Sequence, residues 1–376
     1  MRKRLALTAL ALATAVTAGM AAPATAAGRP DPVQQGLETL VRSDKAPGAL
    51  ASVKDIDGNK EKFRSYTAGV GDLDTHAKVP RDGQVRIGSV TKTFTAVVVL
   101  QLVGEGKISL DATVDDYLPG LVRGKGIDGS KITVRQLLQH TSGLPDFEDD
   151  VTDDILGRRY LSPRDSLDIA LGHEALFEPG EKWSYSNTNY LVAGLIVQKV
   201  TGRPLAEQID RRIIRPTGLR HTYFPSPGET TLRERHPHGY RQDEPGESPL
   251  RDVTEIDPSA SWAAGAMVST NADLNRFFSA LMKGDLLPDA QLKQMLTTIR
   301  VREGEDRYRM GLGIMKVQLS KDCVAWGHSG GIPGYGTWAM ATEDGRAASA
   351  TMTREPKTNE ALAHLEGAVD AALCHR

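Results

Sequence analysis

Apolar residues recur at helical spacing in the middle of this chain and at strand-like spacing near both ends. Short apolar or alternating stretches bounded by Gly, Asp and Asn predict strands at residues 48–55, 62–71, 311–319, 323–327, 334–342 and 346–353. Asp57-Gly58-Asn59 and Glu343-Asp344-Gly345 are typical of hairpin turns between neighbouring strands. Longer periodic stretches predict helices at residues 33–42, 93–105, 134–139, 164–171, 191–200, 205–214, 271–283 and 357–373.

Strands joined by tight turns at both ends of the chain, with helices between them, predict an α+β fold. We expect an antiparallel sheet, flanked by helices, to be built from about 30–88 and 262–376. A mostly helical lobe, about 89–261, is then inserted between its two parts. Residues 226–257 are rich in Pro and charge, and we expect them to form a long surface loop of the kind that is often functional.

The first residues predict an export signal and not part of the fold. Met1-Arg2-Lys3-Arg4 precedes an apolar stretch at 5–22, and Ala24-Thr25-Ala26 fits a cleavage site. We therefore predict a signal peptide at 1–26, a single domain at 27–376, and a secreted, extracellular protein. A membrane anchor is less favoured, because Thr and Gly interrupt the apolar stretch and Pro23 follows it.

Charge and cysteine content exclude several classes of function. The formal net charge is -2, and removal of a signal peptide that carries three basic and no acidic residues would make the balance more acidic. A weakly acidic chain offers no basis for nucleic-acid binding. Two cysteines cannot form a four-thiolate zinc site, and the nine histidines contain no H-E-x-x-H motif, so we expect no metal or cofactor. An even cysteine count in an exported chain favours one disulfide.

Candidate chemistry begins at Ser89-Val90-Thr91-Lys92, at the start of the predicted helix 93–105. A spacing of three at a helix start places the hydroxyl and the amine on one face, one turn apart. A serine hydroxyl becomes a good nucleophile when a neighbour takes its proton, and a lysine whose pKa is lowered by burial is such a neighbour. Taken alone, the tetrapeptide is better explained as a helix N-cap followed by a solvated lysine.

Two downstream motifs change that interpretation. Tyr185-Ser186-Asn187 precedes the predicted helix 191–200, and His328-Ser329-Gly330 follows the predicted strand 323–327. With the Ser89 motif, and with flanking segments at 137–146 and 264–270, their order and spacing resemble the serine β-lactamase and penicillin-binding superfamily. The likeness is greatest to secreted serine D-alanyl-D-alanine carboxypeptidases and extends from about Pro32 to the C-terminus. It implies a β-lactamase-like fold and hydrolysis through an acyl-enzyme.

The resemblance also implies a role for each matched residue. Ser89 is the expected nucleophile, and Lys92 and Tyr185 are the expected proton carriers, with the choice of general base left open. The backbone N–H groups of Ser89 and Gly331 are expected to bind the oxyanion. The expected substrate-binding residues are Asn187, His328, Ser329, Gly330 and Lys316, of which His328, Ser329 and Lys316 would face a substrate carboxylate. A disulfide between Cys323 and Cys374 is implied as well.

The implied function is a monomeric D-Ala-D-Ala carboxypeptidase that acts on peptidoglycan-like peptides with a D-amino-acid terminus and is acylated by β-lactams. Two departures weaken carboxylate recognition: Gly331 follows the third motif where a hydroxyl residue is common, and Lys316 is the sole basic candidate on the preceding strand. An esterase or a D-amino-acid amidase of the same fold needs neither. A β-lactamase, whose third motif usually begins with Lys, and a non-catalytic penicillin sensor are further alternatives.

A competing motif overlaps the third one. Residues 327–331 match G-x-S-x-G, the nucleophile elbow of α/β-hydrolases, and Asp344 and His364 follow in the required order. That elbow leads from a strand into a helix, whereas residues 332–336 contain Pro and Gly and do not predict a helix start. The 47 residues after Ser329 are also too few for the remaining parallel strands and their crossovers. We therefore favour Ser89 over Ser329 as the nucleophile.

Overall fold

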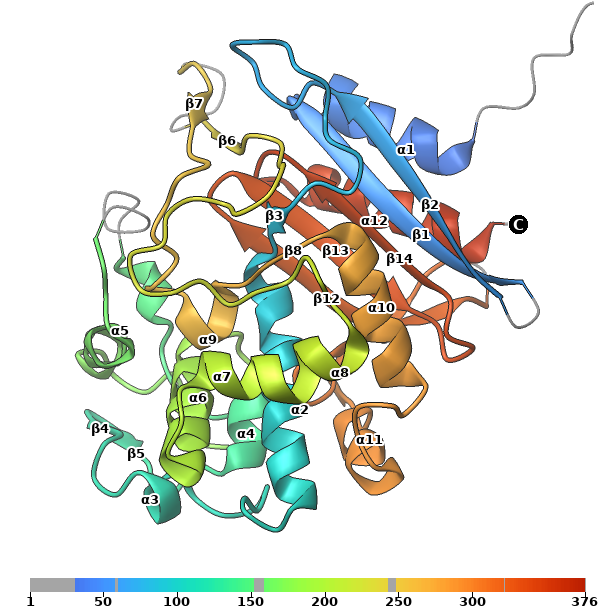
Figure 1. Ribbon diagram of the computed structural model, residues 1–376. Helices are drawn as coiled ribbons and strands as arrows, with labels where there is room; N and C mark the ends of the chain where they lie inside the picture. The colour runs from blue at the N-terminus through green and yellow to red at the C-terminus, as the bar shows by residue number, and fades with distance from the viewer. Residues whose placement is uncertain (1–30, 58–59, 152–158, 243–247, 321, 376) are drawn as a thin grey trace, which may run out of the picture. The chain divides into compact units, whose positions relative to one another are not determined.

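An eight-stranded antiparallel sheet organises the chain (Figure 1). The computed structural model describes residues 31–375 except 58–59, 152–158, 243–247 and 321. In spatial order the strands are β2 (Lys60–Gly69), β1 (Gly48–Asp57), β14 (Ala347–Met352), β13 (Tyr335–Ala341), β12 (Val324–Ile332), β11 (Met315–Gln318), β10 (Tyr308–Met310) and β9 (Ile299–Arg300). The two ends of the sequence meet where β1 pairs with β14, which confirms the predicted sheet.

Helices occupy both faces of the sheet and the inserted lobe. They are α1 (Pro32–Arg42), α2 (Thr91–Gly104), α3 (Val114–Tyr117), α4 (Val134–Leu138), α5 (Pro163–Leu171), α6 (Thr188–Thr201), α7 (Leu205–Ile209), α8 (Arg215–Thr217), α9 (Trp262–Gly265), α10 (Asn271–Met282), α11 (Asp289–Met295) and α12 (Asn359–Cys374). Three small two-stranded sheets pair β3 (Val85–Arg86) with β8 (Val268–Ser269), β4 (Arg123–Gly124) with β5 (Ile127–Asp128), and β6 (Tyr240–Arg241) with β7 (Arg251–Asp252).

Each face of the sheet contributes to a separate apolar core, because side chains alternate along every strand. On β1, Ala49, Ala51 and Val53 pack toward α1 and α12, which lie against one face (Figure 1). Leu50 points to the other face, which α10 covers and which continues into the helical lobe. The sheet is thus sandwiched between helices, as the sequence predicts.

Helix α2 runs through the centre of the lobe and is buried on all sides. It packs against α6, α9 and α11, so it shows no polar face. A short 3-10 turn at Gly88–Val90 precedes it and lies against β12. The start of α2 is therefore held between the sheet and the lobe, which is where the first candidate motif lies.

Several boundaries differ from those predicted. The expected helix 205–214 is α7 followed by a π-helical turn at Asp210–Ile214, which leads into α8. The expected strand 311–319 starts only at Met315, because Gly313 takes a positive φ of 73° against α2, where a side chain would meet Ala96. The expected strand 323–327 continues to Ile332. Strands β9 and β10 and helix α11 were not predicted, since each is short and lacks clear periodicity.

Other predictions fall partly outside the described residues. The signal peptide at 1–26 lies wholly outside them, and the predicted turn 57–59 loses residues 58–59, although β1 and β2 pair as the hairpin requires. Of the loop 226–257, the described part contains β6 and β7 and is tied to β3 by Arg86, which donates to Thr230 O and Thr254 O. No helix in the described part of the chain is long and apolar enough to cross a bilayer.

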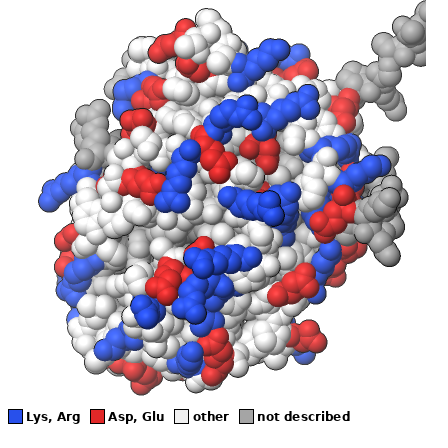
Figure 2. All heavy atoms as spheres, in the orientation of Figure 1, with Lys and Arg blue, Asp and Glu red and all other residues white. Residues whose placement is uncertain are grey.

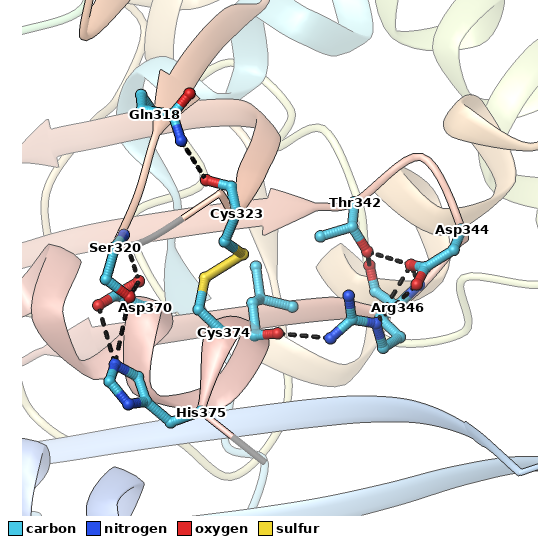
Figure 3. The surroundings of a disulfide bond; sticks show 10 residues. Gln318, Ser320, Cys323, Thr342, Asp344, Arg346, Asp370, Cys374 and His375 are labelled. Carbon is cyan, nitrogen blue, oxygen red and sulfur yellow. Dashed lines mark hydrogen bonds and ion pairs between the residues drawn. A yellow bond between two sulfur atoms is a disulfide. The ribbon is translucent and has the colours of Figure 1, made fainter.

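The structure joins Cys323 to Cys374, the last residue of α12 (Figure 3). This is the expected pairing, with a Cα–Cα distance of 5.8 Å and a sequence separation of 51. Nearby, Ser320 Oγ donates to Asp370 Oδ1 and Arg346 donates to Leu373 O, which also fix the end of α12 to the sheet. A loop of this length contributes up to about 4 kcal/mol in the chain-entropy description of disulfides.

Lys and Arg side chains are interspersed with Asp and Glu over the face of the molecule shown in Figure 2. The view corresponds to that of Figure 1, with α8 and α10 toward the reader. No extended area of one sign is visible on this side. The mixture agrees with a formal net charge of only -2.

Candidate active site

Ser89 lies in the 3-10 turn before α2, where the chain passes closest to β12. Gly88 has a φ of 49°, and a Cβ at this position would lie 2.5 Å from Gly331 O. Gly330 faces the same constraint, because a Cβ there would overlap the carbonyl oxygen of Ile87. Glycine is therefore required on both sides of this contact, since the backbones leave no room for side chains. The contact brings the first and third motifs together.

Lys92 is fully buried and its Nζ is surrounded by oxygen atoms. It lies 2.9 Å from Ser89 Oγ, 2.6 Å from Asn187 Oδ1 and 2.9 Å from the carbonyl oxygen of Ala264. A neutral amine has two N–H groups, which Asn187 and Ala264 can accept. Its lone pair then faces the Ser89 hydroxyl at hydrogen-bonding distance. This arrangement allows Lys92 to accept the serine proton.

Burial shifts the pKa values of Lys92 and Tyr185 in opposite directions. Burial lowers the pKa of Lys92 to about 8, while the negative charges of Glu148 and Asp146 act in the opposite sense. Burial raises the pKa of Tyr185 well above its usual value, and a hydrogen bond with Ser89 lowers it less. Near neutral pH the neutral amine is therefore more accessible than the tyrosinate. Lys92 is the better candidate for the base, and Tyr185 remains a phenol that can donate and relay protons.

The second motif contributes from the turn before α6. Tyr185 lies with its ring centroid 4.9 Å from Lys92 Nζ. Asn187 is held by Asp146, whose Oδ2 accepts from both the backbone N–H and the side-chain amide at 3.0 Å. The amide oxygen of Asn187 consequently points at Lys92. Asn187 is buried, so water does not compete for these hydrogen bonds.

A pocket of about 350 Å³ opens beside Ser89. Apolar and aromatic surface forms most of its wall, and the polar groups of Ser89, Arg309, His328 and Ser329 reach it. Its lining residues are Ser89, Trp183, Tyr185, Val301, Tyr308, Arg309, Met310, Met315, His328, Ser329 and Gly331. Described residues of the loop 226–257 are not among them. The size and lining are those of a site for a small organic group.

The third motif lies within β12, where it continues the strand instead of leading into a helix. This rules out the nucleophile-elbow interpretation of residues 327–331. Ser329 and Gly331 line the pocket as expected, and so does His328. Burial lowers the pKa of His328 to about 4, assisted by the charge of Lys92. His328 is therefore neutral near pH 7, and it can meet a substrate carboxylate as a hydrogen-bonding group but not as a cation.

The structure does not bring Lys316 to the pocket. Its Nζ lies over the ring of Trp326, 5.5 Å from the centroid. The cation in the pocket wall is Arg309, which lies opposite Lys316 in the register of β10 and β11. Arg309 is engaged, because it donates to Asp306 Oδ1 at 2.8 Å and to Thr298 Oγ1 at 3.0 Å. The sequence offered no signal for Arg309, since β10 was not predicted.

Carboxylates gather near Ser89 outside the wall of this pocket. Glu148 accepts a hydrogen bond from Ser261 Oγ at 3.1 Å, and burial raises the pKa of Glu148 to about 7. Glu355 packs on Gly331, where an added methyl group would lie 2.9 Å from Oε1, and burial raises its pKa too. Glu148 and Glu355 are close enough to influence each other. Among the described residues, no cluster of His, Cys, Asp and Glu has the arrangement of a metal site.

Sequence reasoning missed these acids and most of the pocket wall. Asp146 lies in the flanking segment 137–146 and Trp183 is two residues before Tyr185, so both were near recognised motifs. Glu355 lies beyond β14 with no motif around it. Val301 lies just after the short strand β9, which has no periodic pattern. Such residues carry no sequence signal and reach the site only through the tertiary fold.

Comparison with known proteins agrees with this geometry. The profile of the Beta-lactamase family matches residues 33–373. The chain belongs to the Beta-lactamase family. It is thus a serine hydrolase of the superfamily that contains β-lactamases and penicillin-binding proteins, as the three motifs predict. Penicillin-binding protein 4* of Bacillus subtilis (strain 168) is 27% identical over 290 residues, which cover 75% of this chain and 63% of that protein. The chain spans less than two thirds of the length of that relative.

Solved structures of the family match over nearly their full length. A D-stereospecific amidohydrolase from Streptomyces sp. is 37% identical with a TM-score of 0.83, over 92% of this chain and 98% of that chain. A D-amino acid amidase from Ochrobactrum anthropi SV3, complexed with L-phenylalanine amide, is 28% identical with a TM-score of 0.79, over 91% and 96%. These likenesses confirm the β-lactamase-like fold.

The assignment of Lys92 as base predicts how reactivity depends on pH. The rate at which a fluorophosphonate labels Ser89 should rise with pH through a midpoint near 8, because Lys92 must lose its proton to act. Glu148→Gln should move that midpoint downward, since the Glu148 charge raises the pKa of Lys92. The measurement is the labelling rate between about pH 6 and 10, a range that spans this pKa. A flat profile would exclude Lys92 as the base.

Proposed function

We propose that this exported protein hydrolyses amides of D-amino acids, and short peptides that begin with a D-residue, through an acyl-enzyme on Ser89. The observation that carries the proposal is the charge distribution around the nucleophile. The pocket wall is mainly apolar, and Glu148 and Glu355 lie near Ser89 outside that wall. Such a site suits a substrate with an apolar side chain and a free α-ammonium group.

Recognition of a substrate carboxylate is supported less well. His328 is neutral, Lys316 lies over Trp326, and Arg309 is already paired with Asp306. A carboxypeptidase that binds the substrate carboxylate through an ion pair would need one of these groups as a free cation. The D-stereospecific amidohydrolase and D-amino acid amidase that share the fold support the amide and the D-configuration. The D-amino-acid amidase, an alternative at the sequence level, thereby becomes the first choice.

The geometry supports a complete acyl-transfer cycle. Ser89 Oγ attacks the amide carbonyl carbon while Lys92 takes the hydroxyl proton, and the N–H groups of Ser89 and Gly331 bind the oxyanion. When the C–N bond breaks, Tyr185 donates its proton to the leaving nitrogen and regains one from the Lys92 ammonium. Ammonia or an amine departs. Water then attacks the ester, the same groups move its proton, and the D-amino acid is released with Ser89 restored.

A substrate panel tests this proposal. We expect D-phenylalanine amide to be hydrolysed with a kcat/KM at least about tenfold above that of its N-acetyl derivative or of the L-amide, because the negative charge of the half-buried Glu148 and Glu355 behind the pocket wall favours a free ammonium group. Glu355→Gln should reduce the preference for the free amine. Glu360→Gln, an exposed acid on α12, is the matched control and should leave it unchanged.

The same panel includes the competing function. One observation favours a D-Ala-D-Ala carboxypeptidase: Arg309 lies in the pocket wall, where its cation could bind a substrate carboxylate. An N-acylated peptide ending in D-Ala-D-Ala should be a poor substrate if the amidase proposal is right. A higher kcat/KM for that peptide than for the D-amide, together with its loss in Arg309→Ala, would establish the carboxypeptidase instead.

A further inference from the structure

His140 lies directly beneath the tyrosine of the active site. Its imidazole is fully buried and stacks on the ring of Tyr185, with centroids 4.4 Å apart and planes inclined by 22°. It does not line the pocket, so it does not meet a substrate there. The mechanism described above gives it no role.

Two hydrogen bonds from the Tyr185 segment also end on His140. The backbone N–H of Ser184 donates to His140 O at 3.0 Å, and the backbone N–H of Ser186 donates to His140 Nδ1 at 3.2 Å. These donors are the residues immediately before and after Tyr185. A single residue therefore holds the backbone on both sides of the tyrosine and the ring between them.

The surroundings of His140 specify one tautomer. Asn189 Nδ2 lies 3.3 Å from Nδ1, while Asn189 Oδ1 accepts from Ser142 Oγ and Nδ2 also donates to Ser186 O. Nδ1 is thus an acceptor of two donors, and the proton is on Nε2. The titratable groups that face the ring are Lys92 and His328, and burial, followed by the charge of Lys92, keeps the pKa of His140 well below its usual value. The ring is a neutral support over the working pH range.

The backbone of His140 has a φ of 59°, in the left-handed region that non-glycine residues seldom adopt. Side chains are retained in such conformations where the surroundings determine them, and this occurs often at functional sites. Here the conformation directs both His140 O and Nδ1 toward residues 184–186. The strained backbone of His140 therefore occurs together with its two hydrogen bonds to Ser184 and Ser186, on either side of Tyr185.

We propose that His140 is a positioning residue, which holds the Tyr185 phenol at Ser89 by stacking on its ring and accepting the hydrogen bonds on either side. The inference rests on the proposed function only in that Tyr185, which shares a hydrogen bond with Ser89, protonates the group that leaves, the fluoride of a fluorophosphonate included. It gives a role to the segment 137–146. In the same segment, Asp146 orients Asn187 by accepting two of its hydrogen bonds.

Two variants separate the contacts. His140→Phe keeps a ring for stacking but loses the Nδ1 acceptor. His140→Asn keeps an acceptor near Nδ1, loses the ring, and tolerates the left-handed backbone, so it is expected to fold. We expect each to slow fluorophosphonate labelling of Ser89 by about 10- to 100-fold, the effect of a small displacement of a catalytic group. His364→Phe, on α12 and paired with Asp44, is the control and should label at the parent rate.

The decisive measurement repeats both variants in a Tyr185→Phe background. If His140 acts through the phenol, its replacement should then change labelling by less than about twofold. Full loss in both backgrounds would show a general structural role and overturn the inference, as would unaltered labelling of the single variants. Labelling does not depend on the substrate class, so failure of the D-amide to be hydrolysed would refute the proposed function and leave this test intact.

Discussion

Ser89→Ala should abolish hydrolysis and covalent labelling, with kcat reduced by about 10⁴-fold or more. The reason is that Ser89 is the hydroxyl at hydrogen-bonding distance from the buried amine of Lys92. Its backbone N–H also lies against β12, where the oxyanion is expected to bind. The measurement is turnover of the best substrate, combined with mass spectrometry of the protein after reaction with a fluorophosphonate or a β-lactam.

Ser329→Ala is the matched control for this experiment. Ser329 lines the same pocket and belongs to the G-x-S-x-G sequence, so it is the other serine that a reagent in the site would meet. We expect its replacement to weaken activity without removing the label, because Ser329 lies in a continuous strand. An adduct found on Ser329 would refute the assignment of the nucleophile.

Lys92→Ala and Tyr185→Phe should each reduce kcat/KM by about 100-fold or more, the usual scale for a general acid–base group. The double variant should lose much less than the product of the two single losses. Both groups handle the same proton: Lys92 takes it from Ser89, and Tyr185 passes one to the leaving group. Their proximity, with the amine 4.9 Å from the ring centroid, allows that transfer. Groups that act as one unit are non-additive.

The controls for this cycle are a lysine and a tyrosine of the same protein outside the site. Lys316→Ala removes a lysine that lies over Trp326, and Tyr160→Phe alters an exposed tyrosine. Both variants should retain parental kcat/KM. Single losses that multiply in the double variant would indicate that Lys92 and Tyr185 serve different chemical steps.

Short-range patterns in the sequence determine the family and the outline of the fold, and they carry the prediction that Ser89 is the nucleophile. Ser89 and Lys92 are one helical turn apart, so their contact follows from local geometry alone. The sheet is encoded by apolar strands at both ends of the chain, and the turn at 343–345 specifies the pairing of β13 with β14. The pairing of Cys323 with Cys374 was implied by the family resemblance, and the structure confirms it.

The chemistry of the substrate site was decided by tertiary structure. Burial sets the charge states of Lys92, Tyr185 and His328, and burial is a property of the packed lobe and sheet. Arg309 and Lys316 are opposite each other on β10 and β11, yet Arg309 lines the pocket while Lys316 lies over Trp326, a difference that periodicity does not specify. Glu355 and Glu148 lie more than 200 positions apart in the sequence, and only the fold brings them close enough for the charge of Glu355 to raise the pKa of Glu148. Sequence motifs therefore identify the reaction, and long-range packing selects the substrate.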